Sequence, residues 1–197
     1  MLGAGLSRSR SAAQYVQTVA DAAATGTYRN RYVFAVIDQE TLEVETRVNI
    51  TFTPNLTFEL YAQPFIASGD YLALKELAAP RSFEFLQYGR DTGTITRGAD
   101  GRYEVDPSGS GSGTFFVTDR DFNFRSLLGN AVLRWQWRPG STLFLVWQQS
   151  RSERLTPGAG DPEGRYGRFA FGPDARALAR IAADHTFMVK LTYWLNP

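Results

Sequence analysis

The sequence predicts an all-β protein: an antiparallel, up-and-down transmembrane β-barrel, of which this chain forms a C-terminal portion. Three observations favour this fold. Long predicted strands alternate apolar with polar residues, short connections alternate with long ones, and aromatic residues of separate strands lie at one level along the strands. We expect about seven strands, and we assign residues 1–197 to one barrel domain with two long extracellular loops, residues 69–121 and 151–184.

Alternation is clearest in residues 41–63, on both sides of Thr53, Pro54 and Asn55. The apolar positions are Leu42, Val44, Val48, Ile50, Phe52, Leu56, Phe58, Leu60 and Ala62, with Thr46 as the one exception. Polar residues fill the positions between them, so the pattern predicts a hairpin with one apolar and one charged face. Each strand has about ten to twelve residues, which is roughly twice the usual strand length and enough to cross a bilayer when tilted.

Further strands are expected on both sides of this hairpin. We place them at residues 11–20, 28–37, 122–137, 141–150 and 185–195, with a turn at Asp38, Gln39 and Glu40 leading into the hairpin. Residues 93–105 predict a small hairpin, and the glycine-serine run 108–113 predicts a flexible tip. Residues 173–183 have helical composition, with Pro173 suited to a first turn.

The connections favour a barrel with a defined orientation. The links at residues 53–55 and 138–140 are short, whereas 69–121 and 151–184 are long. Outer-membrane barrels keep short turns on the periplasmic side and long loops outside. If the last strand runs from the outer surface of the membrane to the periplasmic side, both long loops lie on the outer surface. The links 21–27 and 38–40 are of intermediate length and support neither side of the membrane. In a soluble sandwich, no physical constraint would place all long loops at one end of the strands.

Aromatic residues lie beside the two tight turns and at the end of the last strand. They are Phe52, Phe58, Trp135, Trp137, Tyr193 and Trp194. Aromatic rings are favoured at the membrane interface, so we expect this group near the periplasmic side. A soluble sheet would bury the same residues in its core, but their clustering at one level on separate strands favours the barrel.

Composition sets limits without deciding the fold. The chain is 43% hydrophobic with a mean hydropathy of −0.28, as in soluble domains and also in barrels, whose strands are polar on one face. The sequence contains no run of eighteen apolar residues, so it does not predict a transmembrane helix. The net charge of +1 gives no nucleic-acid signal, so no nucleic-acid partner is expected. Cysteine is absent, which excludes disulfides, zinc-thiolate sites and thiol catalysis.

The first fourteen residues lack the basic start, apolar core and cleavage site of a secretory signal peptide. For an outer-membrane protein, this pattern leads us to expect that the chain is the C-terminal part of a longer precursor. The alternative is a complete cytosolic protein.

Three blocks of the sequence, residues 31–71, 127–151 and 185–197, carry a family resemblance, with the wording YAQPF, SGDY and RPGSTLFLVW. They resemble the C-terminal barrel of bacterial outer-membrane proteins of unknown function that carry an N-terminal family-9-like carbohydrate-binding domain. The resemblance implies a location in the bacterial outer membrane. It also implies three partners: outer-membrane lipid, upstream barrel strands and the carbohydrate-binding domain of the same precursor. That domain is not in this sequence, so sugar binding is not transferred to these residues.

Catalytic chemistry has weak support in the sequence. His185 is the only histidine, which excludes a multi-histidine metal site. Carboxylates in the expected outer loops could form an acid–base pair for glycoside cleavage, and solvated loop charges explain them equally well. These carboxylates are Asp119, Asp121, Asp161, Glu163 and Asp174. The run 109–114 lacks the helix and lysine of a phosphate loop. We therefore expect no catalytic residue, cofactor or metal.

Charged residues on the polar side of the strands are the main candidate site. The expected lumen-lining residues are Glu43, Glu45, Arg47, Glu59, Arg134 and Lys190. Charges inside a barrel must be hydrated or paired. They could therefore form a channel wall or plug-binding surface, or form interstrand ion pairs that fix the barrel, and we favour the ion pairs.

The expected function is a non-enzymatic membrane anchor or channel in a carbohydrate-related envelope protein. One alternative is a surface glycan hydrolase with its site in the outer loops, and another is a soluble β-rich binding module. Single-chain barrels usually have an even number of strands from eight upward, so the remaining strands are expected from upstream sequence.

Overall fold

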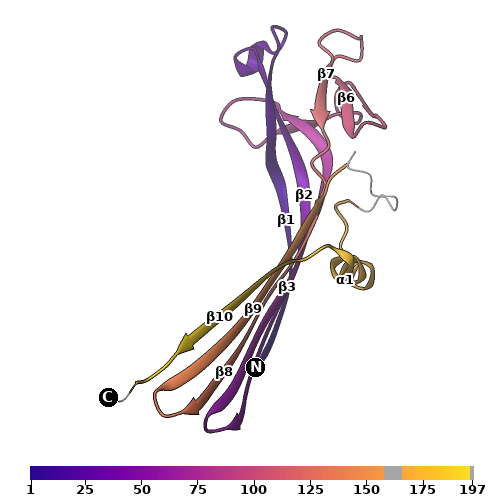
Figure 1. Ribbon diagram of the computed structural model, residues 1–197. Helices are drawn as coiled ribbons and strands as arrows, with labels where there is room; N and C mark the ends of the chain where they lie inside the picture. Colours follow the sequence, from indigo (N-terminus) through magenta and orange to yellow (C-terminus); the bar gives the residue numbers. More distant parts are fainter. Residues whose placement is uncertain (158–165, 196–197) are drawn as a thin grey trace.

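The computed structural model describes residues 1–157 and 166–195. Six long antiparallel strands form one elongated sheet in the order β1-β2-β3-β8-β9-β10 (Figure 1). Their bounds are β1 Leu2–Ala20, β2 Asn30–Thr53, β3 Leu56–Leu77, β8 Phe122–Arg138, β9 Ser141–Leu155 and β10 Asp184–Thr192. The predicted all-β class is confirmed.

Smaller elements lie between the long strands. Strand β4 (Phe85–Gln87) pairs with β3, and β5 (Thr94–Arg97), β6 (Arg102–Asp106) and β7 (Phe115–Thr118) form a second antiparallel sheet. A short 3-10 helix, η1, spans Thr25–Thr27, and helix α1 spans Phe171–Arg180. The small hairpin predicted at residues 93–105 is confirmed as β5 and β6, and the helix predicted at 173–183 as α1.

The molecule has two unlike ends (Figure 1). The tight turns of β2–β3 and β8–β9 lie at one, the turn end, and β4–β7 lie at the other, the loop end. The hydrophobic core is confined to the loop end: Val16, Val33, Ala35, Leu74, Tyr88, Val105, Phe115 and Val117. Toward the turn end the sheet is a single layer, so neither of its faces is covered by a second layer of the described chain (Figure 1).

The hairpin predicted at residues 41–63 is confirmed. Thr53 pairs with Leu56 across the Pro54-Asn55 turn, and Val48 pairs with Leu60 farther along the same two strands. Paired residues of antiparallel strands share a face, so the apolar residues of β2 and β3 form one surface.

The turn predicted at residues 38–40 is wrong, because β2 continues through it for 24 residues. Asp38 and Glu40 form ion pairs with Arg10 and Arg8 on β1, at 3.5 and 3.7 Å. These cross-strand charges explain why three polar residues stand inside a strand. The sheet consequently has six long strands rather than seven, and the link between β1 and β2 lies at the loop end.

Three strands are longer than predicted. Strand β1 begins at Leu2 rather than residue 11, because Leu2 and Leu6 alternate with glycine and serine opposite β2. Strands β3 and β9 continue to Leu77 and Leu155, so the predicted loops 69–121 and 151–184 begin inside strands. The first of these segments also contains β4–β7.

The sheet is open rather than closed into a barrel. Strands β1 and β10 are its two edges, and within the described residues each is paired on one side only.

A β-bulge at Ala73 changes which side chains of β3 point to each face. Between Leu72 and Lys75, β3 has one residue more than the facing part of β2, and Ala73 has a φ of +50°. Before the bulge, odd-numbered residues share the face of Arg47 and Glu59; after it, Leu74 and Glu76 share that face. The bulge thus brings Leu74 into the loop-end core.

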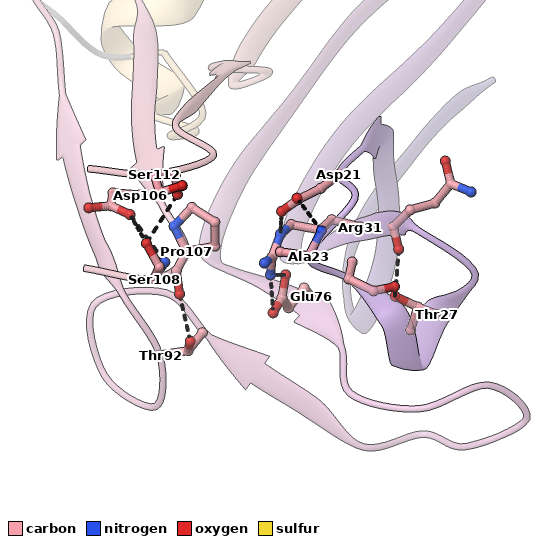
Figure 2. A network of polar contacts seen from close by, with 12 residues as sticks. Asp21, Ala23, Thr27, Arg31, Glu76, Thr92, Asp106, Pro107, Ser108 and Ser112 are labelled. Atoms are coloured by element: carbon pink, nitrogen blue, oxygen red, sulfur yellow. Dashed lines mark hydrogen bonds and ion pairs between the residues drawn. The ribbon is translucent and has the colours of Figure 1, made fainter. Parts of the chain in front are cut away.

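A buried ion-pair network connects three elements at the loop end. Figure 2 shows Arg31 on β2 between Asp21, which follows β1, and Glu76 on β3; its shortest distances to the two carboxylates are both 2.6 Å. The Tyr88 hydroxyl donates to Glu76 at 2.9 Å. The hydrogen bond from Arg31 lowers the pKa of Asp21, and burial beside Glu76 raises the pKa of Tyr88.

Replacing Arg31 with methionine is expected to destabilise the loop end by about 3–5 kcal/mol, because two carboxylates would remain buried without their cation. Faster hydrogen exchange of amides in β4 and in the outer part of β1 and β2 would measure this loss. Arg8→Met is the matched control: Arg8 is 69% exposed in its ion pair, so the cost is expected to stay below about 1 kcal/mol. Equal effects of the two substitutions would contradict a stabilising role of the buried network.

Candidate functional site: the two faces of the sheet

All six predicted lumen-lining residues lie on one face of the sheet, which we call the polar face. Glu43, Glu45 and Arg47 stand at alternate positions of β2. Glu59, Arg134 and Lys190 lie on the same face, because residues that are paired across neighbouring strands share a face. The pairs that connect them are Asn49–Glu59, Thr57–Arg134, Arg134–Phe144 and Phe144–Lys190. The register therefore brings charges from four strands to the same surface.

Side chains of β2 and β3 form a chain of polar contacts on this face. Arg47 donates to Glu45 at 2.6 Å and lies 5.3 Å from the centre of the Tyr61 ring. Tyr61 donates to Gln63 at 3.0 Å, and Gln63 donates to Glu43 at 2.6 Å. Three of the six charged residues are held in place by these contacts.

The other three charged residues have different surroundings. Lys190 lies 6.0 Å from the centre of the Phe144 ring, and within the described chain neither Glu59 nor Arg134 takes part in an ion pair. Among the six, the single ion pair is Arg47–Glu45, inside one strand. The expected interstrand ion pairs between these six residues are therefore not found, and the unpaired charges require water.

Two adjoining hollows lie on the polar face, with volumes of about 420 and 330 Å³. Tyr61 and Asn130 line both, Arg47 and Glu59 line the first, and Gln148 lines the second. The sequence alternation that predicts the charged residues also places Tyr61 and Gln148 on this face, although neither is charged. Together these side chains offer hydrogen-bond donors and acceptors to a hydrophilic solute.

One row of the polar face is apolar. It consists of Val132, Val146 and Met188, which are paired across β8, β9 and β10. The polar character is therefore strongest over β2 and β3 and weaker toward the β10 edge.

The opposite face carries an exposed apolar band. On β10 alone Phe187, Val189 and Leu191 are 75%, 68% and 63% exposed, and Ile50 and Phe52 on β2 are also exposed. An exposed apolar surface that crosses several strands is typical of contact with a membrane or a protein partner. No helix in the described part of the chain is long and apolar enough to cross a membrane.

The border of the band toward the loop end is sharp on every long strand. The last apolar residues are Leu6, Leu42, Ile66, Leu127, Trp147 and Phe187, in sheet order. The next residue on the same face of each strand is Arg8, Glu40, Ser68, Arg125, Gln149 or His185, respectively. Each strand thus changes from apolar to polar or ionisable within one step of the alternation.

This border runs obliquely across the sheet. Leu6, Leu42 and Ile66 lie in one row, but Ile66 pairs with Arg125, so Leu127 lies two residues closer to the turn end. Leu127 pairs with Arg151, and Trp147 lies four residues closer again. Phe187 is paired with Trp147. The border therefore descends by six residues, two plus four, from β1 to β10.

Aromatic residues gather at the turn end. The rings of Trp135 and Trp137 are 6.2 Å apart, and the Arg138 guanidinium lies 4.1 Å from the centre of the Tyr193 ring. Trp194 packs on Gly140, where an added Cβ would lie 2.7 Å from the tryptophan. Of the six aromatic residues predicted at one level, these four therefore lie beside the second tight turn.

His185 has an aromatic environment. Its ring stacks between those of Trp147 and Phe187, at 5.8 and 6.4 Å, and its Nδ1 accepts a hydrogen bond from Trp147 Nε1 at 3.1 Å. Within the described residues no carboxylate pairs with His185. This arrangement lacks the acidic partner of a Ser-His-Asp site.

Two of the loop carboxylates that the structure describes, Asp119 and Asp174, take part in ion pairs. Asp174 on α1 is buried and forms an ion pair with Arg125 at 2.9 Å. Asp119 pairs with Arg97. Asp161 and Glu163 lie outside the described residues. The described parts of the chain contain no group of three or more potential metal ligands.

Asp121 is the most perturbed carboxyl group and lies between β7 and β8. It is 8% exposed, it accepts a hydrogen bond from the Tyr71 amide at 2.6 Å, and its own amide donates to Asp119 at 3.1 Å. Burial, assisted by the charges of Asp119 and Asp70, raises the pKa of Asp121 to about 7. Asp121 is therefore partly protonated at neutral pH.

Comparisons with protein families, with curated proteins and with solved structures find no match to this chain.

Asp121→Asn is expected to stabilise the protein above pH 7 by on the order of 4 kcal/mol, because the pKa of Asp121 rises from 3.8 to about 7, each pKa unit corresponds to about 1.4 kcal/mol, and asparagine cannot ionise. The folded-state pKa of Asp121 is raised above the model-peptide value of 3.8. The parent chain therefore loses stability as the pH rises from about 4 to about 7, whereas near pH 4 the two chains are expected to be equal. Denaturant unfolding at several pH values measures the difference.

Asp100→Asn is the matched control, since the side chain of Asp100 is 52% exposed in its ion pair with Arg102. It is expected to produce no gain above pH 7. A gain for Asp100→Asn equal to that for Asp121→Asn would contradict burial as the cause.

Proposed function

We propose that this chain forms part of the wall of a bacterial outer-membrane β-barrel, with the apolar band against lipid and the polar face toward an aqueous interior. The role is non-enzymatic, either as a membrane anchor or as part of a channel. The observation that carries the proposal is the oblique apolar band, which crosses all six long strands and has exposed residues on each of them except β3.

The height of the band agrees with a membrane. On β2 it extends from Leu42 to Phe52, which are ten steps apart, and at about 3.3 Å per step this is about 33 Å along the strand. Strands of outer-membrane barrels are tilted by about 35–45°, so this length corresponds to a height of about 25 Å. The apolar band of such barrels is about 25 Å tall.

The slope of the border gives the tilt independently. Six residues correspond to about 20 Å along a strand, and the five steps from β1 to β10 correspond to about 24 Å across the sheet. A border level with the membrane surface then requires strands tilted by about 40°, within the range of closed barrels. The border descends only between β3 and β9, so this tilt angle is an average over the whole sheet.

The two edges indicate what the sheet requires. In a bilayer, every backbone amide and carbonyl must have a protein partner, and an open edge leaves a row of them unpaired. We propose that β1 and β10 pair with further strands of the same precursor, as the family resemblance implies. With six strands in this segment, an even number from upstream would complete an even-numbered barrel.

The soluble alternative has less support from the fold. A soluble sheet buries at least one face, whereas here the hydrophobic core is confined to the loop end. The resemblance also connects the barrel to a carbohydrate-binding domain. In our proposal the sheet anchors that domain in the outer membrane, and the polar hollows face the channel.

Val48→Arg and Leu133→Arg are expected to cost about 2–4 kcal/mol each, because they place a charge against lipid near the middle of the band. In the full-length precursor, both are expected to reduce the heat-modifiable, folded fraction recovered in outer membranes. Densitometry of unheated and heated samples on a detergent gel gives that fraction.

Asn49→Arg is the matched control, since it lies next to Val48 on β2 and points to the polar face. It is expected to assemble normally, as is Glu45→Gln. If polar-face and apolar-face substitutions impaired assembly equally, the assignment of the faces would be wrong.

A further inference from the structure

The small sheet β5–β7 packs on one particular face of the main sheet. Strand β2 alternates without a bulge from residue 30 to 51. Its buried residues Val33 and Ala35 are odd-numbered, as are Glu43 and Arg47, so they point to the polar face. These two residues form the loop-end core together with Val105 on β6 and Val117 on β7. The second layer therefore covers the polar-face side of the sheet.

Helix α1 packs on the opposite side. Asp174 of α1 contacts Arg125 on β8, and the backbone of Ala179 accepts a hydrogen bond from Arg151 on β9. Arg125 and Arg151 have the parity of Leu133 and Leu145, which belong to the apolar band. The two long insertions thus lie on different faces, and only the first lies above the polar hollows.

Polar contacts tie the second layer to the main sheet and brace its loops. Gln17 on β1 donates to the backbone oxygen of Phe116 at 3.0 Å. Asp119, just after β7, pairs with Arg97, and Asp121 binds the Tyr71 amide of β3. Figure 2 shows two loop braces: Thr92 donates to the Pro107 carbonyl at 3.0 Å, and Ser108 donates to Asp106 at 3.0 Å. The predicted flexible tip is thus folded around the Asp106 carboxylate.

The face of the second layer that points away from the core carries polar and charged residues around one exposed aromatic residue, Phe116. Ile95, Val105 and Phe115 are paired across β5–β7 and face the core. The alternate residues Thr96, Glu104 and Phe116 are paired in turn, and all three are exposed. Arg102 lies on the same side, with its guanidinium 4.9 Å from the centre of the Phe116 ring.

We propose that β5–β7 is an inward-folded constriction at the loop end of the barrel interior, which limits by size the hydrophilic solutes that reach the polar hollows. This inference rests on the proposed function, because only a closed barrel gives the polar face an interior. A layer packed on that face then occupies part of the entrance, and Thr96, Arg102 and Glu104 border the remaining opening. Small polar and charged solutes pass, and bulky ones are excluded.

The absence of cysteine makes this proposal testable by labelling. Asn130→Cys places the single thiol of this chain in the polar hollows. The full-length precursor, with any cysteine outside this chain replaced by serine, is labelled in intact cells with a small hydrophilic maleimide or with a maleimide on a 5-kDa polyethylene glycol, a size chosen on the order of a small protein domain. The small reagent is expected to react at least about ten times faster than the large one, corresponding to about 1.4 kcal/mol. Ser110→Cys, at the exposed loop tip, is the control and is expected to react with both reagents.

Release of the layer is expected to remove the size limit. Replacing residues 93–118 with a short glycine-serine link, or introducing Val105→Asp into the core, is expected to let the large reagent reach Asn130→Cys. Heat-modifiable migration verifies that the barrel strands remain folded in each variant. Equal rates of the two reagents at Asn130→Cys in the otherwise unaltered chain would overturn the constriction.

Leu133→Cys distinguishes failure of this inference from failure of the proposed function. It lies on the apolar band and is expected to react with neither hydrophilic reagent. If Leu133→Cys and Asn130→Cys reacted alike with the small reagent, the barrel assignment itself would fail. If they differed but reagent size had no effect at Asn130→Cys, only the constriction would fail.

Discussion

The register of the antiparallel sheet is the constraint on which the other features depend. Side chains alternate between the faces, so a slip of one residue in any strand would exchange its apolar and polar sets. In the single-layer part, the register of all six strands is not shifted, and the irregularities of register lie at the two tight turns or in the loop-end parts of β1 and β3. Regular pairing keeps six charged residues from four strands on one surface, although no second layer enforces it there.

Loop end and turn end are stabilised in different ways. At the loop end, a second layer, a buried core and the Arg31 network replace water with protein contacts. Toward the turn end the sheet has neither, and its apolar face is exposed. The loop end therefore folds by ordinary burial, whereas the other half depends on its surroundings to cover the apolar band. The sharp change from Leu42 to Glu40 on β2 lies between these two regimes.

Local alternation made the β2–β3 hairpin and the six charged residues of β2, β3, β8 and β10 predictable. It failed where the decisive contact was distant in sequence: Asp38 and Glu40 resembled a turn because their partners, Arg10 and Arg8, are about thirty residues away. Strand β1 was missed over residues 2–10 because glycine and serine conceal its alternation. Of the second layer, only one hairpin was predicted. Its packing depends on Val33 and Ala35, and the turn wrongly predicted at residues 38–40 obscured the fact that these two residues share a face with Glu43 and Arg47.

The bulge at Ala73 separates two frames of alternation in one strand. Before it, odd-numbered residues of β3 face the polar side, and after it even-numbered residues do, at the cost of one alanine in the left-handed region. The bulge thus lies between the single-layer segment of β3, which carries part of the apolar band, and the loop-end segment, which packs in the core. Each can keep the alternation that its own surroundings require. The extra residue absorbs the mismatch, so the sequence of the loop-end layer can vary without exchanging the faces of the strands below it.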